Sequence, residues 1–326
     1  MAETMRAVVA TSLAGVSALR VDTQPIPEPK PGQVLIRVRA AGINYADVMQ
    51  ARGLYAGGPK PPYIAGMEAA GEVVETTDGC GLEVGDRVMG YGVSAFAEYI
   101  AWPAGNLLPL PNGWTMEQGA AFPVQWLTAY GCLRTVGRLE EGETVLIHAA
   151  AGGVGLAATT LAKHLGAKVF ATASSKEKLE LAKAHGADEL INYSTQDFVA
   201  EVKARTEGQG VDLVLEMVGG ETFGRNFRAV KPYGRIVVFG SATAQQAVID
   251  NTTLIFKPVE VIGYHLAVMA QKRPDLMTPC LGEVMQLVKR GVITPEAPTT
   301  FPLGEAVRAL RDLEDRKTTG KLVLIP

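Results

Sequence analysis

The pattern of hydrophobic and polar positions changes near residue 123. Before that point, short segments such as residues 34–42 alternate apolar and polar side chains, as half-buried strands do, and turns rich in glycine and proline separate them. From about residue 123 to residue 264, apolar strands alternate with helical segments. This alternation is typical of a parallel sheet with crossover helices. The pattern therefore predicts a β-rich part followed by a doubly wound α/β part.

The second part carries the stronger pattern. Its predicted strands lie at residues 144–150, 168–174, 189–193, 211–218, 234–240 and 259–265. Beyond them, the pattern predicts two amphipathic helices, at 275–290 and 304–316, and a last strand at 321–326. This tail is too short to build a core of its own, so we expect it to return to the β-rich part. The expected domains are residues 1–122 with 265–326, and residues 123–264.

The composition is that of an ordinary globular protein, with 47% hydrophobic and 20% charged residues in a chain of 326. A net charge of -3 gives no general positive field for nucleic acid. The three cysteines stand singly, without the spacing of disulfide or zinc frameworks, which favours a cytoplasmic protein. The first residues lack the pattern of a secretory signal, and the charge-free run at 145–162 fits a strand, turn and helix better than a membrane span. We therefore expect no nucleic-acid or membrane partner.

The sharpest local motif is HAAAGGVG, at residues 148–155. It follows a predicted strand and opens a predicted helix, as a dinucleotide-binding turn does, although Ala150 replaces the usual first glycine. Gly152 and Gly153 let the backbone approach a pyrophosphate, Gly155 lets helix and strand approach each other, and the helix N-terminus offers N–H groups to phosphate. The predicted cofactor-binding residues of this turn are Ala151, Gly152, Gly153, Val154 and Gly155. A purely structural tight turn is the alternative.

The end of the next strand indicates which dinucleotide binds. NAD-binding folds carry an acidic residue about 20 positions after the glycines. Here Ser174 and Ser175 occupy that corner, and Lys176 and Lys178 follow them. Hydroxyl and ammonium groups suit a 2'-phosphate, so the sequence favours NADPH. The alternative is that the lysines only solvate the start of an exposed helix.

A second strand end is predicted to border the cofactor. The strand at 234–240 ends in Gly240, and Ser241 follows it. Ligands of open α/β sheets bind at the carboxyl ends of the strands, so both residues are predicted to form part of the cofactor wall.

Several motifs together resemble a known family. They are AAGINYADVMQARGLY (40–55), GMEAAGEV (66–73), GDRVMGYG (85–92), HAAAGGVG (148–155) and RKTTGKLVLIP (316–326). In this order they are similar to zinc-independent medium-chain dehydrogenases/reductases of the NADPH:quinone oxidoreductase (zeta-crystallin-like) branch. The resemblance implies a GroES-like catalytic domain, formed by residues 1–122 and 265–326, and a Rossmann domain. It also implies a homodimer joined at an edge strand, for which 259–265 is the candidate.

The resemblance also bears on metal binding. Zinc-dependent relatives hold their catalytic metal with a cysteine and a histidine, where this chain has Asn44 and Met67. Neither residue anchors zinc, so no metal site is predicted. A quinone or an α,β-unsaturated carbonyl draws electrons toward its own oxygen, so a hydrogen-bond donor at that oxygen can serve instead of a metal.

Three residues are the candidates for catalysis. Asn44 and Tyr55 can donate a hydrogen bond or a proton to the acceptor oxygen. Tyr45, in the same motif, is the third candidate. Helix capping by Asn44, loop closure by Tyr55 and core packing by Tyr45 are the structural alternatives.

The resemblance implies further cofactor contacts. It assigns Lys178, Tyr193 and Arg316 to the NADPH phosphate, and it places Gln125 and Thr128 near the nicotinamide. The sequence thus predicts a metal-free, NADPH-dependent quinone oxidoreductase with a small-molecule substrate. Two alternatives stay open: a reductase of 2-alkenals, enones or enoyl thioesters, and a weakly catalytic NADPH-binding protein of the crystallin kind.

Overall fold

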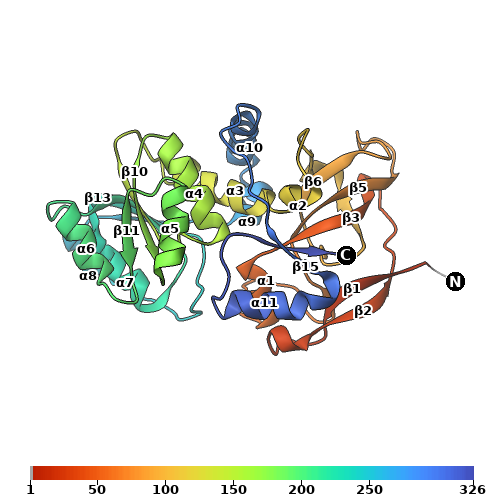
Figure 1. Cartoon of the computed structure of the whole chain (residues 1–326), viewed down its shortest axis with the longest axis horizontal. Helices are drawn as coiled ribbons and strands as arrows, with labels where there is room; N and C mark the ends of the chain where they lie inside the picture. The colour runs from red at the N-terminus through yellow and green to blue at the C-terminus, as the bar shows by residue number, and fades with distance from the viewer. Residues whose placement is uncertain (1–2) are drawn as a thin grey trace. The chain divides into compact units, whose positions relative to one another are not determined.

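A computed structural model describes residues 3–326 and divides them into two compact units. The first unit contains the residues up to Val124 together with Pro295–Pro326, and the second contains Gln125–Thr294. The sequence predicts that the chain returns to the first domain at residue 265, whereas in the structure it re-enters the first unit at Pro295. The helices between these two points, α9 (Leu266–Lys272) and α10 (Pro274–Lys289), both labelled in Figure 1, belong to the second unit and contact each other.

The first unit is β-rich and mainly antiparallel. Its strands are β1 (Thr4–Ala10), β2 (Leu19–Pro25), β3 (Gln33–Ile43), β4 (Tyr63–Ile64), β5 (Glu68–Thr76), β6 (Arg87–Tyr91), β7 (Tyr99–Pro103), β8 (Leu107–Pro109), β15 (Thr299–Pro302) and β16 (Leu322–Ile325). They form a three-stranded sheet in the order β2-β1-β4 and a larger sheet in the order β15-β16-β3-β5-β6-β8, with β7 also paired to β3. The C-terminal β16 thus lies antiparallel to β3, with Leu322 opposite Ile43.

Three helices belong to the first unit: α1 (Tyr45–Ala51), α2 (Met116–Ala120) and α11 (Ala306–Glu314). Short 3-10 turns lie at Val16–Ala18, Ala104–Asn106 and Leu303–Glu305. The apolar face of α11, including Ala309 and Leu310, joins the same core as Val48 of α1 and Phe96. Burying this face holds α1, and with it the start of the 44–55 segment, in place.

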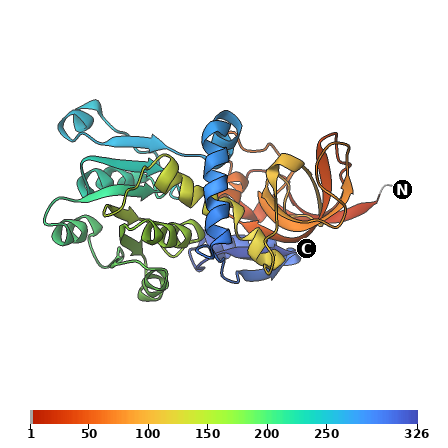
Figure 2. The same ribbon diagram turned by 90° about the horizontal axis from the view of Figure 1, so that it is seen from above.

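The second unit is a doubly wound α/β domain. Its strands are β9 (Thr144–Ile147), β10 (Lys168–Ala173), β11 (Glu189–Asn192), β12 (Val211–Glu216), β13 (Val230–Val238) and β14 (Glu260–Gly263). All are parallel, in the order β11-β10-β9-β12-β13-β14. The fold-class prediction is therefore confirmed. In Figure 2 the light-blue segment with β14 forms one edge of this sheet.

Helices connect these strands. They are α4 (Gly153–His164), α5 (Lys176–Ala184), α6 (Phe198–Arg205), α7 (Gly220–Ala229) and α8 (Asn251–Phe256), and α3 (Pro123–Tyr130) with a π-turn at Gly131–Thr135 leads into β9. The chain moves along the sheet in one direction through α4 and α5 and in the other through α7. Right-handed crossovers therefore put these helices on opposite faces, where α4 packs against α5 and α6 against α7.

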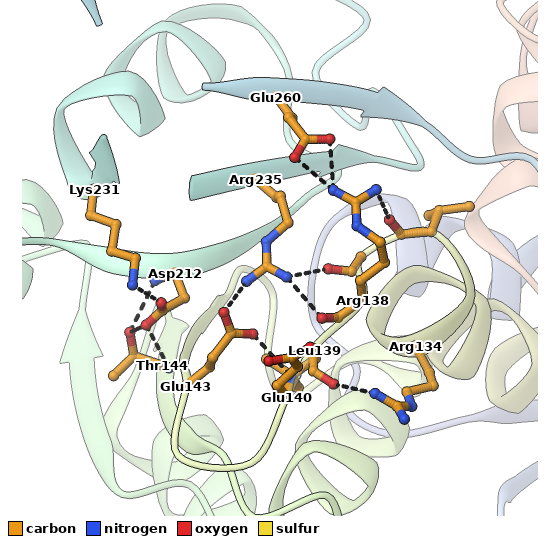
Figure 3. Close-up of polar contacts among 12 residues, drawn as sticks. Arg134, Arg138, Leu139, Glu140, Glu143, Thr144, Asp212, Lys231, Arg235 and Glu260 are labelled. Atoms are coloured by element: carbon orange, nitrogen blue, oxygen red, sulfur yellow. Dashed lines mark hydrogen bonds and ion pairs between the residues drawn. The ribbon is translucent and has the colours of Figure 1, made fainter. Parts of the chain in front are cut away.

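A polar network fixes the amino ends of the parallel strands (Figure 3). Arg235 of β13 donates to the carbonyl oxygens of Gly137 and Arg138, both at 2.8 Å, and pairs with Glu143. Arg138 in turn binds Glu260 of β14 at 2.6 Å. Because Arg235 is buried and all its partners are acceptors, it locks the loop before β9 onto β13. Ligands of open α/β sheets bind at the opposite, carboxyl ends of the strands.

Candidate functional site

The turn after β9 is tightly folded. Ala149 has a φ of +50°, in the left-handed region that residues with a Cβ rarely adopt. A Cβ added at Gly155 would lie 2.4 Å from the Ala149 carbonyl oxygen, so only glycine fits there. A Cβ at Gly152 would lie 3.3 Å from the same oxygen. Gly155 therefore has a structural reason as well as the predicted ligand-binding one.

The amino end of α4 is left without an internal anion. Its N-cap is Gly152, no side chain caps it, and its first turn carries no acidic residue. The following helices differ: Ser175 caps α5 and Asp197 caps α6, each accepting backbone N–H groups. The free N–H groups and the positive dipole end of α4 therefore fit a bound pyrophosphate.

A buried chain of hydrogen bonds links this turn to a neighbouring one. His148 Nδ1 lies 3.0 Å from the Thr172 hydroxyl, and His148 Nε2 lies 2.8 Å from Asn226 Oδ1. The Asn226 amide donates to Glu216, whose other oxygen accepts the N–H groups of Val218 and Gly219 at 2.6 and 2.7 Å.

The direction of this chain fixes the protonation of His148. Since Asn226 donates with its amide nitrogen, its oxygen must accept, so His148 carries its proton on Nε2 and accepts from Thr172. Burial lowers the pKa of His148, although the Glu216 carboxylate opposes that shift. His148 is thus a neutral structural residue that connects the end of β9 to the end of β12.

The predicted phosphate-binding residues of the second unit come together at the ends of β10 and β11. The N–H of Tyr193 donates to Ala173 at 3.1 Å, and the Ser194 hydroxyl donates to the Ser174 carbonyl at 3.0 Å. Lys178 is half-buried in the first turn of α5, where its N–H donates to the Ser175 hydroxyl at 3.3 Å. Ser175 therefore serves as a helix cap.

Arg316 lies elsewhere in the chain. It follows α11 in the first unit, is exposed, and has a φ of +59°. Its predicted contact with the phosphate stays a prediction.

The segment after β13, which is predicted to form part of the cofactor wall, packs closely against the turn that follows β12. Gly219 has a φ of +81°, and a Cβ there would lie 2.7 Å from the Ser241 hydroxyl oxygen. The N–H groups of Ala242 and Thr243 donate to Met217 and Val218 at 2.8 and 2.9 Å. Gly240 and Ser241 therefore lie beside the turn that Glu216 organises.

Gln125 and Thr128 both lie on α3 and are 8% exposed. The side-chain oxygen of Gln125 is buried and has no hydrogen-bond partner among residues 3–326. A buried amide oxygen of this kind favours a ligand donor, which agrees with a binding role.

Asn44 is held by three contacts in the first unit. Its amide nitrogen donates to Glu68 at 2.8 Å and to the Gly42 carbonyl at 3.4 Å, and its amide oxygen accepts from the Lys321 ammonium at 2.7 Å. Both amide hydrogens are thus in use, so the predicted donation from Asn44 to a substrate oxygen requires breaking one of these bonds. Asn44 stands at the N-cap position of α1, where its N–H donates to Asp47 at 2.7 Å.

The two candidate tyrosines differ in position. Tyr45 is the first residue of α1, whereas Tyr55 lies in the loop after it, and both are half-buried. Burial raises the pKa of Tyr55, and the carboxylate of Asp47 raises it further. Tyr55 therefore keeps its proton at neutral pH and can act as a hydrogen-bond donor.

Sequence reasoning missed the pair that holds Asn44. Glu68 is fully buried and also accepts the N–H of Val124 at 2.9 Å, and Lys321 pairs with it. Both residues lie in motifs that carry the family resemblance, 66–73 and 316–326. Glu68 directly precedes two alanines and Lys321 directly precedes the apolar run at 322–325, and a charged residue beside such a stretch is the signal that could have identified each.

Residues 3–326 contain neither a cluster of metal-binding side chains nor a helix that could span a membrane. No group of three or more histidine, cysteine, aspartate or glutamate side chains in this part of the chain could hold a metal ion. No helix within the same residues has the length and apolar character needed to span a membrane.

Comparisons with known proteins agree with this geometry. The family model "Alcohol dehydrogenase GroES-like domain" matches residues 30–112, and "Zinc-binding dehydrogenase" matches residues 153–280. A quinone oxidoreductase of Pseudomonas aeruginosa is 37% identical, with 94% of each chain covered. The rat synaptic vesicle membrane protein VAT-1 homolog is 33% identical over 99% of this chain and 84% of its own. The structure of Escherichia coli quinone oxidoreductase complexed with NADPH has a TM-score of 0.92 at 31% identity, covering 99% of this chain and all of that one.

Proposed function

We propose that this chain, which belongs to the medium-chain dehydrogenase/reductase family in its quinone oxidoreductase branch, is an oxidoreductase that uses NADPH to reduce quinones or similar conjugated carbonyl compounds. The observation that carries this proposal is the uncapped, glycine-rich amino end of α4 beside a strand end with hydroxyl and ammonium groups. The relatives named quinone oxidoreductase, one of them complexed with NADPH, support it.

The residues of the second unit fit the cofactor part by part. Residues 151–155 would hold the pyrophosphate on the N–H groups of α4. Ser174, Lys178 and Tyr193, with Arg316 of the first unit, would hold the 2'-phosphate. The remaining candidates, for the nicotinamide end, are Gln125, Thr128, Gly240 and Ser241. When bound, NADPH supplies a hydride, and the protein supplies orientation and a proton donor.

The first unit would supply that donor. Tyr55 fits best, because its hydroxyl is protonated at neutral pH and its side chain lies in a loop rather than in the core. Because Glu68 and Lys321 already bind its amide group, Asn44 would fix the shape of the catalytic segment rather than donate to the substrate. Tyr45, which follows Asn44 in the chain, would contribute packing.

The cofactor choice is tested by changing Lys178 to Ala. Loss of a charge-assisted hydrogen bond to the 2'-phosphate should raise the Kd for NADPH about 10- to 100-fold, while the Kd for NADH changes little. Fluorescence titration of both cofactors gives these values. Lys176→Ala is the matched control, since Lys176 is the exposed lysine two residues earlier. Equal weakening of NADPH and NADH would reject the phosphate role of Lys178.

Three properties complete the proposal. Turnover would not need a metal, so prolonged treatment with a chelator should leave it unchanged. Three free cysteines, Cys80, Cys132 and Cys280, favour the cytoplasm. A homodimer would form at the exposed edge strand β14.

A substrate panel separates the main proposal from its alternatives. We expect NADPH consumption to be fastest with quinones. A clear preference for 2-alkenals, enones or enoyl thioesters would replace the substrate class, and tight NADPH binding without consumption would favour a binding protein.

A further inference from the structure

Three neighbouring strands of the first unit bring three polar side chains together. The register of β3 and β5 sets Gly42 opposite Glu68, and Asn44 follows the end of β3. On the other side of β3, β16 begins just after Lys321. The Lys321 ammonium donates to the Asn44 amide oxygen at 2.7 Å, and the Asn44 amide nitrogen donates to Glu68 at 2.8 Å. The pairing of these strands therefore assembles the Glu68 cluster, which consists of Lys321, Asn44 and Glu68.

The two carboxyl oxygens of Glu68 bind different elements. Oε1 accepts the Asn44 amide N–H and pairs with Lys321. Oε2 accepts the backbone N–H of Val124 at 2.9 Å. Val124 lies in the first turn of α3, where the backbone N–H groups have no partner within the helix. One carboxylate thus joins the start of the 44–55 segment to the start of α3.

Close packing holds this carboxylate in place. Glu68 is fully buried, and the Lys321 side chain is 7% exposed. A Cβ added at Gly42 would lie 2.7 Å from Glu68 Oε1, so the bare backbone of β3 approaches the carboxylate. Moving either the Asn44 amide or the Val124 N–H away would leave a buried oxygen of Glu68 short of a donor, which is costly. Both partners are therefore held relative to Glu68.

The two joined elements both carry candidates for the proposed reaction. The 44–55 segment ends in Tyr55, the proposed donor to the acceptor. Gln125, a candidate for the nicotinamide end, directly follows Val124, and its buried side-chain oxygen has no hydrogen-bond partner among residues 3–326. The direction in which this oxygen points depends on where α3 begins, and Glu68 fixes that point through Val124.

We propose that Glu68 is a positioning residue of the reduction: its two carboxyl oxygens fix the 44–55 segment, through Asn44, relative to α3, which carries the nicotinamide candidates. This inference rests on the function proposed above. In this role Glu68 acts through Asn44 and Val124, and it needs no contact with the substrate or the cofactor.

An amide cannot replace this carboxylate. The side chain of Glu68→Gln has a single acceptor oxygen, so it can no longer offer one oxygen to Asn44 and another to Val124. Adding Lys321→Met removes the ammonium that would otherwise stay buried without its counter-charge. The double variant Glu68→Gln/Lys321→Met therefore contains neither charge of the pair, but it still lacks the second acceptor. It separates the positioning role of Glu68 from the effect of a buried, unpaired charge.

Turnover and stability together give the first readout. We expect the double variant to be more stable to urea than Lys321→Met alone, yet its kcat with a quinone should fall about 10- to 100-fold below that of the wild type, as for misplaced reacting groups. The matched control is Glu72→Gln/Arg39→Met, which removes a half-exposed ion pair at 2.7 Å from the same strands, β5 and β3. Its kcat should stay within about twofold of the wild-type value.

Ligand binding gives a second readout that needs no turnover. The probes are NADPH and adenosine 2',5'-bisphosphate, which carries the 2'-phosphate but no nicotinamide. In the double variant the Kd for NADPH should rise about 5-fold, as for one lost hydrogen bond, whereas the Kd for the fragment should stay within about twofold. Calorimetric titration gives both values. Glu68→Gln alone repeats the comparison if the double variant does not fold.

The outcomes separate this role from the proposed function. Equal weakening of NADPH and the fragment, or a kcat that recovers together with stability in the double variant, would show a merely structural role and overturn the proposal. If the wild type reduces quinones in that case, the proposed function stands. A wild type that consumes no NADPH with any quinone or enone would overturn both.

Discussion

At the scale of single residues, the buried pair of Lys321 and Glu68 controls the geometry of the candidate catalytic segment. Their side chains are 7% and 0% exposed. Three donors, from Lys321, Asn44 and Val124, satisfy the Glu68 carboxylate. A buried ion pair of this kind adds little net stability, but removing one of its partners is strongly destabilising, because the other charge stays buried.

Lys321→Met should therefore destabilise the fold by about 3–5 kcal/mol, because it leaves the Glu68 charge buried and unpaired. Adding Glu68→Gln removes that charge, so the double variant should recover part of the loss. Urea unfolding of the wild type, both single variants and the double variant gives the coupling between the two positions. Additive effects of the two changes would show that the pair is not coupled.

The same residues show the limit of sequence reasoning. The motif singles out Asn44, and the structure places it at the N-cap position of α1. The motif does not reveal that the Asn44 amide is already engaged, because its partner Lys321 is 277 positions away and arrives only when β16 pairs with β3. Local pattern carries no information on such a contact.

At the scale of elements, the strands of the parallel sheet could be predicted from the sequence, whereas the buried hydrogen bonds of His148 could not. All six predicted strands are present, as β9 to β14, because apolar runs bounded by glycine or helix caps signal buried parallel strands. The short α8 was not predicted, since its segment buries no side chain and shows no apolar stripe. The hydrogen bonds of His148 depend on α7 packing on the sheet, which periodicity alone does not specify.

His148 gives the second unit a pH dependence. Burial holds its pKa in the folded state below the ordinary 6.5, so the unfolded chain binds more protons as pH falls through 6.5. Folding stability contributed by neutral His148 is therefore complete above that pH and is lost below it. Between pH 7.5 and 5, the wild type should lose more unfolding free energy than His148→Gln, measured by urea unfolding at each pH. His164→Gln, at an exposed position, is the control, and it should keep the wild-type slope.

At the scale of the whole molecule, the C-terminal region shows what periodicity leaves open. The predicted helices at 275–290 and 304–316 correspond to α10 and α11. Their apolar stripes predict burial but not the partner, and α10 packs in the second unit whereas α11 packs in the first. An amphipathic helix at a domain crossing fits either side by pattern alone.

The edge of the parallel sheet carries the last prediction. Among the strands of residues 3–326, β14 pairs only with β13, so its other edge offers unpaired backbone groups. Val261 on this strand is 37% exposed, and Ile255 and Phe256 of the preceding α8 are 68% and 83% exposed. An exposed apolar edge of this kind promotes aggregation of a monomer, and a second copy of the same chain would cover it.

Because a two-fold axis would bring the same patch of both copies together, Val261→Lys would place two positive charges at the joint and bury them. Sedimentation should then show a dimer for the wild type and a monomer for Val261→Lys. Val84→Lys, an exposed valine of the first unit, should stay dimeric. A wild type that sediments as a monomer at all concentrations would reject the dimer, and the exposed edge would then need protection of another kind.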